Sequence, residues 1–233
     1  MCAVQPLSKS KQMIQINISD QIRAAAPGLR VIQFEADVRN QLTSDALWQV
    51  LLDEEAAVKL TYAISDIAHR PGIAATRSAY KALGKEPNRY RPSAEALCRR
   101  AVQGKGLYRI TTLVDIINIL SMRSGYSIGG FDRDKIIGET LTLGVGMNGE
   151  PFQAIGRGQL NIEFLPVYRD AAGSIGTPTS DADRTKLTDD TTRLLMTVNV
   201  YGEEMSDEDF IGLANQLLTD YASAENIKIQ TIR

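Results

Sequence analysis

Apolar and polar residues alternate in several short stretches of this sequence. Ile14, Ile16 and Ile18 are separated by polar residues, which predicts a strand over 13–18. The same spacing of Ile32, Phe34 and Ala36 predicts a second strand over 32–38. Further strands are predicted at 140–147, 151–155, 159–168, 193–201 and 226–233.

Other stretches repeat their apolar residues at helical spacing. A stripe including Leu47, Leu51 and Val58 predicts a long helix from about 45 to 68, with N-caps at Thr43 to Asp45. Gly84 predicts the end of a helix over 73–83. Ser206 and Asp209 form a capping box. The remaining predicted helices are a short one before Pro27-Gly28, 93–104, 113–124 and about 206–223.

The second half of the sequence has residue patterns typical of strands and turns. Asn148-Gly149 lies between two predicted strands and predicts a β-hairpin, while 173–190 is read as a long polar loop. Helices and strands segregate, so we predict an α+β fold with mixed or antiparallel sheets and packed helices. We expect residues 1–12 to form a mobile tail and 13–233 a single domain.

The composition narrows the class of protein. The 233 residues are 43% hydrophobic and 23% charged, which is typical of a globular chain with a large core. No run of about 18 apolar residues is present, and the N-terminus lacks the apolar stretch of a signal peptide. Cys2 and Cys98 are the only cysteines and His69 is the only histidine. We therefore expect a cytoplasmic protein without a metal or another cofactor.

The net charge of −2 conceals an uneven distribution. Residues 70–109 hold ten Lys/Arg and two Asp/Glu, whereas the remainder holds sixteen Lys/Arg and 26 Asp/Glu. This basic segment is either a solvated helical surface or a phosphate-binding face, since tyrosines lie among its cations. The candidate RNA-binding residues are Arg77, Tyr80, Arg91, Arg99 and Arg100.

Two familiar motifs match this sequence only in part. Gly144 to Gly149 matches the dinucleotide fingerprint as a string, but the broken sequence after it cannot form the required helix. The acidic residues after Asp181 lack the glycine and glutamate of a calcium loop. The hydroxyls, arginine and carboxylates of 180–191 instead suggest a polar pocket or a polar turn. Asn118 is either a structural hydrogen bonder or part of that pocket, and Glu150 is either a solvated turn residue or a functional acid.

Several motifs occur together in an order that resembles a known family. Residues 106–136 resemble part of the editing module of the bacterial phenylalanyl-tRNA synthetase beta subunit. The matching positions are Val114, Asp115, Asn118, Gly125, Phe131, Asp132, Asp134, Lys135 and Ile136. Gly149-Glu150 and 180–196 are similar to its later blocks. Residues 77–81 and 89–100 look like those of stand-alone members. The resemblance covers about 60–200 and implies the third and fourth domains of that subunit.

The resemblance implies hydrolysis of mischarged aminoacyl-tRNA in trans, with tRNA or aminoacyl-tRNA as partner. In the full enzyme this module edits tyrosyl-tRNA and does not aminoacylate. Glu150 is then the catalytic candidate. The substrate-pocket candidates are Asn118, Gly129, Gly130, Asp181, Arg184 and Thr185. Gly129 stands where the family motif has histidine, so no imidazole is expected at the site. The alternatives are a non-catalytic RNA-binding module and a protein that binds a small, amino-acid-like molecule.

Overall fold

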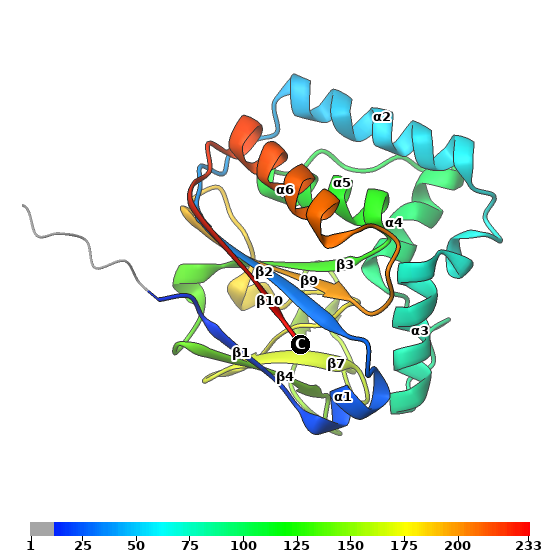
Figure 1. Ribbon diagram of the computed structural model, residues 1–233, viewed down its shortest axis with the longest axis vertical. Helices are drawn as coiled ribbons and strands as arrows, with labels where there is room; N and C mark the ends of the chain where they lie inside the picture. Colours follow the sequence, from blue (N-terminus) through cyan, green and yellow to red (C-terminus); the bar gives the residue numbers. More distant parts are fainter. Residues whose placement is uncertain (1–11) are drawn as a thin grey trace, which may run out of the picture.

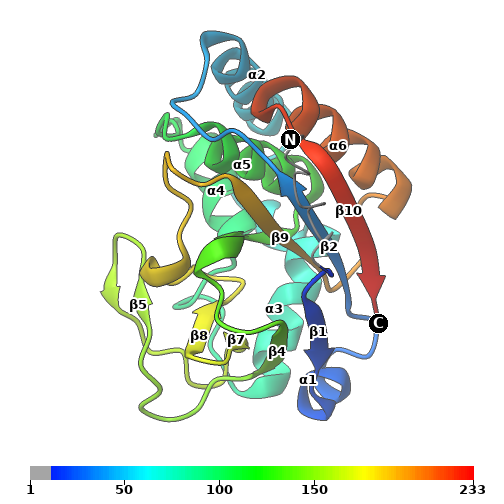
Figure 2. The same cartoon turned by 90° about the vertical axis from the view of Figure 1, so that its left-hand side faces the viewer.

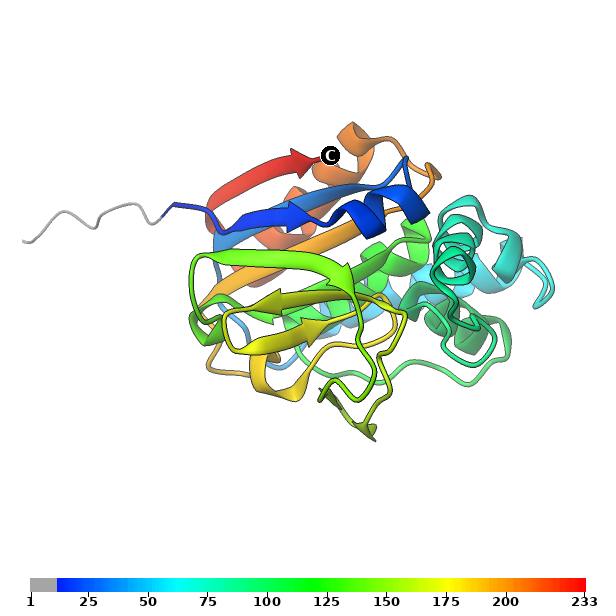
Figure 3. The same cartoon turned by 90° about the horizontal axis from the view of Figure 1, so that it is seen from below.

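The computed structural model describes residues 12–233, which form three layers (Figure 1). Helices cover one face of a four-stranded sheet, and a second four-stranded sheet covers its other face. Figure 2 shows the same layers after a quarter turn. The second sheet lies nearest the viewer in Figure 3. The helical layer consists of α2 (Asp45–Thr61), α4 (Ser93–Val102), α5 (Thr112–Ser124) and α6 (Asp207–Ala222).

The sheet under the helices, here called the helix-covered sheet, is antiparallel throughout. Its strand order is β10-β2-β9-β3, with β3 at one edge. β2 and β9 pair along eight residues each, with Phe34 opposite Met196. The strands are β2 (Arg30–Asp37), β3 (Ser127–Asp132), β9 (Arg193–Val200) and β10 (Glu225–Ile232).

The other sheet, here called the outer sheet, is mixed. Its order is β1-β4-β7-β8, and β1 runs parallel to β4 while the other neighbours are antiparallel. Its strands are β1 (Gln15–Ile18), β4 (Thr140–Val145), β7 (Pro166–Asp170) and β8 (Gly173–Gly176). The remaining elements are α1 (Asp20–Ala25), α3 (Pro71–Leu83), the short ribbon β5 (Gln153–Ala154) and β6 (Gly158–Gln159), and the 3₁₀ turns η1 (Ile67–His69), η2 (Arg133–Lys135) and η3 (Asp183–Thr185).

Three apolar clusters follow from these layers. Phe34 and Phe210 belong to the cluster between the helices and the helix-covered sheet. Phe131 and Tyr168 belong to the cluster between the two sheets. Val167, which precedes Tyr168 on β7, belongs to a third cluster on the far face of the outer sheet. Neighbouring residues of a strand point to opposite faces, so both faces of the outer sheet are covered.

The predicted α+β fold class is confirmed by the mixed sheets and packed helices. Gly84 ends α3 with φ 92°, and Ser206 caps α6 by accepting the Asp209 N–H, both as the sequence predicts. Residue 12 aside, the expected mobile tail over 1–12 lies outside the described residues. No helix among residues 12–233 is long and apolar enough to span a membrane.

The predicted hairpin at Asn148-Gly149 is wrong. The chain does turn there, but β4 pairs with β1 and β7, whereas β5 pairs with β6. Both edges of β4 are therefore occupied. The segment just after β4 is held elsewhere, because Gly146 exchanges backbone hydrogen bonds with Phe164 and Leu165. A strong local turn signal was overridden by long-range strand pairing.

Three predicted boundaries also change. The helix from 45 ends at Thr61 rather than near 68, because Tyr62 is extended and the Asp66 carboxylate accepts the Ala63 N–H in a separate turn. The predicted strand 159–168 is interrupted between β6 and β7 by a turn in which Phe164 has φ 65°. The loop 173–190 contains β8 and η3, since β8 completes the edge of the outer sheet.

Candidate functional site

Two edge strands meet at Asp181. The Gly130 N–H of β3 donates to Asp181 Oδ2 at 3.1 Å, and Asp181 forms an isolated bridge with Gly176 of β8. Asp181 therefore connects the edge of the helix-covered sheet, through its carboxylate, with the edge of the outer sheet, through its backbone. We call the region of Gly129, Gly130, Gly176 and Asp181 the seam.

Glycines allow close packing at the seam. A Cβ atom at Gly129 would lie 2.8 Å from Phe131 Cζ and 2.9 Å from Thr197 Oγ1, and a Cβ at Gly176 would lie 2.7 Å from Phe131 Cζ. The Phe131 ring is thus held between two glycines. A larger residue such as histidine at 129 would require both neighbours to move.

The seam carboxyl group is titratable near neutral pH. Burial raises the pKa of Asp181 to about 7, and the hydrogen bond from the Gly130 N–H lowers it only in part. No basic side chain within residues 12–233 forms an ion pair with it. A carboxyl group with a pKa near the working pH is suited to proton transfer.

Several buried hydroxyls lie on the face of the helix-covered sheet that packs against the outer sheet. Ser127 lies opposite Asn199 and Gly129 opposite Thr197 on neighbouring strands. Ser127 Oγ, Thr197 Oγ1 and the Tyr201 hydroxyl are buried and have no hydrogen-bond partner among residues 12–233. Such groups normally bond to protein, water or ligand, so these hydroxyls add polar groups to the packed interior between the two sheets.

Glu150, the catalytic candidate, lies away from the seam. Arg169 donates to both of its carboxylate oxygens at 2.7 and 2.6 Å, and the Met147 N–H donates at 2.9 Å. Burial by itself would raise the pKa of Glu150, but these donors lower it below its usual range. Arg169 follows Tyr168 on β7, so the ion pair lies on the far face of the outer sheet.

The other pocket candidates divide between the seam and its surroundings. Gly129, Gly130 and Asp181 come together. Thr185, in η3 just after Asp181, is buried, and its Oγ1 has no hydrogen-bond partner within 12–233. Arg184 instead binds the Asp170 carboxylate, with Nη1 3.0 Å from Oδ2. Asn118 lies half-buried on α5, next to Ile117, whose side chain packs against Gly130.

The basic segment 70–109 does not form one continuous cationic face. The buried Arg70 side chain binds Glu204 and the Met122 carbonyl. Lys85 donates to the carbonyls of Asn161 and Glu163. Several basic side chains of this segment therefore connect parts of the folded chain and are not free to form a cationic surface.

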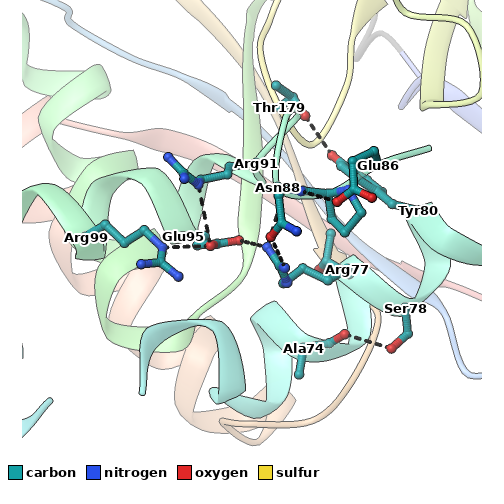
Figure 4. A network of polar contacts seen from close by, with 12 residues as sticks. Ala74, Arg77, Ser78, Tyr80, Glu86, Asn88, Arg91, Glu95, Arg99 and Thr179 are labelled. Carbon is teal, nitrogen blue, oxygen red and sulfur yellow. Dashed lines mark hydrogen bonds and ion pairs between the residues drawn. The ribbon is translucent and has the colours of Figure 1, made fainter. Parts of the chain in front are cut away.

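The remaining arginine candidates for RNA binding lie in two places on the structure. Arg100 donates to the Gly106 carbonyl and lies over the Tyr108 ring. Arg77, Arg91 and Arg99 gather around Glu95 of α4 and are here called the arginine cluster (Figure 4). The role of Glu95 was missed from the sequence, where it reads as an ordinary acidic residue of a first helical turn.

Tyr80 does not share the exposure of that cluster. Its side chain is fully buried, and its hydroxyl lies 2.9 Å from Thr179 Oγ1. A ring in this position is inaccessible to a base, so Tyr80 supports the fold at this place rather than an RNA surface. Burial raises the pKa of its hydroxyl above the usual range.

One loop connects the arginine cluster to the seam. Residues 177–180 lead directly into Asp181. The Ser93 N–H at the start of α4 donates to the Pro178 carbonyl at 2.8 Å, and Thr179 contacts Tyr80 of α3. Figure 4 shows Thr179 and Tyr80 in the same view as the cluster. The two candidate regions therefore share a structural connection.

A separate groove of about 660 Å³ contains none of the predicted site residues. Among the residues that line it are Arg23 and Arg30 near α1, Glu203 and Asp207 near α6, and Arg233. Arg30 is bound to Asp207 within it. In the part of the chain that the structure describes, no group of three or more His, Cys, Asp or Glu side chains is arranged to hold a metal ion.

Comparisons with known proteins agree with the fold. The B3/4 domain family matches residues 75–208, a range that includes the seam and the arginine cluster. A crystal structure of an N-terminal fragment of the phenylalanyl-tRNA synthetase beta-subunit from Pyrococcus horikoshii is similar, with a TM-score of 0.50 and 14% identity over 96% of this chain. The chain spans 55% of that fragment. No curated protein matches the sequence.

Proposed function

The chain belongs to the B3/4 domain family, and from this premise we propose that it is a tRNA-linked domain that hydrolyses the ester bond of a mischarged aminoacyl-tRNA. The similar solved structure is a fragment of a tRNA synthetase subunit, which supports the tRNA link. We further propose that the domain corresponds to the third and fourth domains of that subunit, acts in trans in the cytoplasm and does not aminoacylate.

The Asp181 carboxyl group carries this proposal. Its pKa of about 7 allows it to accept a proton at neutral pH, and it lies beside a sheet face whose buried hydroxyls have no partner in the described part of the chain. Asp181 would take a proton from water as the water oxygen attacks the ester carbonyl carbon. The ester C–O bond then breaks, and the Asp181 carboxyl group returns this proton to the leaving ribose oxygen, which regenerates the Asp181 carboxylate.

Asp181 is favoured over Glu150 as the acid that acts on substrate. Both oxygens of Glu150 are engaged by Arg169 and the Met147 N–H, and a carboxylate held with a lowered pKa is a weak base at neutral pH. Among residues 12–233, the Asp181 carboxylate accepts one hydrogen bond, from the Gly130 N–H, and forms no ion pair with a cation. Glu150 keeps a place in the proposal as the residue that fixes the turn at 147–150 against β7.

The arginine cluster is the proposed contact for tRNA phosphates. Arg77, Arg91 and Arg99 converge next to the loop that carries Asp181, and Arg100 lies on the same helix as Arg99. Guanidinium groups suit phosphate oxygens. This arrangement supports RNA held at α4 while its aminoacyl end reaches the seam.

The test is a deacylation assay over a panel of mischarged tRNAs. Asp181→Asn should lower kcat at least tenfold on any tRNA that the native chain deacylates, while Glu150→Gln, in a folded variant, should lower it less. The native rate should rise with pH and level off above about pH 7, following ionisation of Asp181. Absence of turnover on every tRNA of the panel, or equal activity of Asp181→Asn and the native chain, would refute the proposal.

A second candidate function is tRNA binding without hydrolysis. The arginine cluster favours it, because that cluster needs no catalytic group to bind phosphate. Salt-dependent tRNA binding by the native chain, together with no deacylation of any tested tRNA, would select this function over the first.

A further inference from the structure

We propose that the arginine cluster is a preorganised site for a single phosphate group of an RNA backbone, and that Glu95 is the residue that positions it. This inference rests on the RNA-binding part of the proposed function and is independent of hydrolysis at the seam. The negative charge of Glu95 by itself would weaken RNA binding, whereas we assign to Glu95 a role that strengthens it.

Glu95 is a fully buried carboxylate. Its side chain is 0% exposed, its Oε2 lies 2.8 Å from Arg77 Nη1, and its Oε1 lies 2.7 Å from Arg99 Nε. Arg91 Nε is farther, at 3.9 Å from Oε1. A buried carboxylate is stable only when it is paired, so these contacts fix Arg77 and Arg99 in place, as Figure 4 shows.

The cluster keeps an excess of positive charge. Three guanidinium groups surround one carboxylate, which can neutralise only one of them. The side chains of Arg77, Arg99 and Arg91 are 14%, 23% and 52% exposed. The excess positive charge therefore extends from the mostly buried Arg77 and Arg99 to Arg91, which is exposed to solvent.

The hydrogen-bond donors point to the same conclusion. Asn88 and the Pro87 carbonyl hold Arg77, and the Ile64 carbonyl accepts from Arg99 Nη1. Arg91 Nη1 and Nη2 and Arg99 Nη2 have no partner among residues 12–233. Donors on two planar forks suit the oxygens of one phosphate.

Substitution of Glu95 separates positioning from simple charge. Glu95→Gln removes a negative charge, so a purely electrostatic surface would bind RNA more tightly. If Glu95 positions the guanidinium groups, the same variant binds RNA more weakly, because Arg77 and Arg99 lose the anion that holds them. The sign of the change in affinity decides between the two explanations.

The experiment measures binding of fluorescently labelled, deacylated bulk tRNA to the full chain over a range of salt concentrations. Arg91→Ala and Glu95→Gln should each weaken binding about tenfold, or about 1.4 kcal/mol. The matched control is Arg89→Ala: Arg89 is an exposed neighbour over the Tyr90 ring without a contact to Glu95, and its loss should change affinity less than about twofold. Arg91→Ala should also lower the slope of log K against log salt by about 0.7 to 0.9.

Tighter or unchanged binding by folded Glu95→Gln, or equal losses in Arg89→Ala and Arg91→Ala, would overturn the inference. If Glu95→Gln does not fold in thermal denaturation, the comparison of Arg91→Ala with Arg89→Ala decides. Native tRNA binding that no variant weakens overturns the phosphate site and leaves hydrolysis to its own assay. Conversely, tRNA binding that depends on the cluster, without deacylation of any tRNA, supports the phosphate site and refutes the proposed hydrolysis.

Discussion

Replacement of Asp181 by asparagine tests the electrostatics of the seam through the stability of the fold. The asparagine side chain keeps the size of the residue and an oxygen that can accept the Gly130 N–H, but it cannot ionise. Burial raises the pKa of Asp181 to about 7, from an ordinary value of 3.8. The native chain should therefore lose stability on ionisation of this group, and Asp181→Asn should not.

The sign and size follow from proton linkage. Between about pH 4 and pH 7 the unfolded chain releases the Asp181 proton while the folded chain keeps it, so the free energy of unfolding falls as pH rises. A difference of about 3 in pKa corresponds to about 4 kcal/mol. Asp181 keeps some contact with solvent, and screening reduces this figure, so we expect a loss of about 2 to 4 kcal/mol.

The assay is urea denaturation of both proteins at intervals from pH 4.5 to pH 8.5. The difference in unfolding free energy between Asp181→Asn and the native chain should increase in favour of the variant up to about pH 7 and then stay constant. Subtracting the two curves removes the titration of the other carboxylates. A difference that does not vary with pH would refute the reasoning, because it would mean that the Asp181 carboxyl group is solvated like an ordinary one.

Two further predictions concern packing and reactivity. Gly146→Ala should destabilise the fold by more than about 2 kcal/mol, because a Cβ there would lie 1.9 Å from the Ile162 carbonyl oxygen. Gly212→Ala, at an exposed position of α6, should stabilise the fold by about 0.5 to 1 kcal/mol. Urea denaturation measures both, and equal effects would contradict the glycine geometry. Burial raises the pKa of Cys98 to about 11, so in a Cys2→Ala background its thiol should react with a disulfide reagent only at the rate of unfolding. Rapid reaction under native conditions would show that Cys98 is accessible.

Local signals in the sequence predicted the elements that depend on local physics. The end of α3 depends on the backbone freedom of Gly84, and the start of α6 depends on capping by Ser206. The strands 30–37 and 193–200 follow from the residue pattern within each segment. The hairpin at 148–149 failed because strand pairing is settled between distant segments, and β4 finds its partners at β1 and β7. Periodicity carries no information about such partners.

The candidate site divides in the same way. The sequence predicted Asp181 and the arginines of 77–99 as candidates for a polar, phosphate-linked site, and the family resemblance added Gly129 and Gly130; these roles stay predictions. It could not show that Asp181 caps the free edge of β3, that Glu150 is engaged by Arg169, or that Tyr80 is buried. Desolvation and pairing depend on what the whole chain packs around each group. The residue types of the site are therefore encoded locally, whereas their pKa values, exposure and partners are decided only by the tertiary structure.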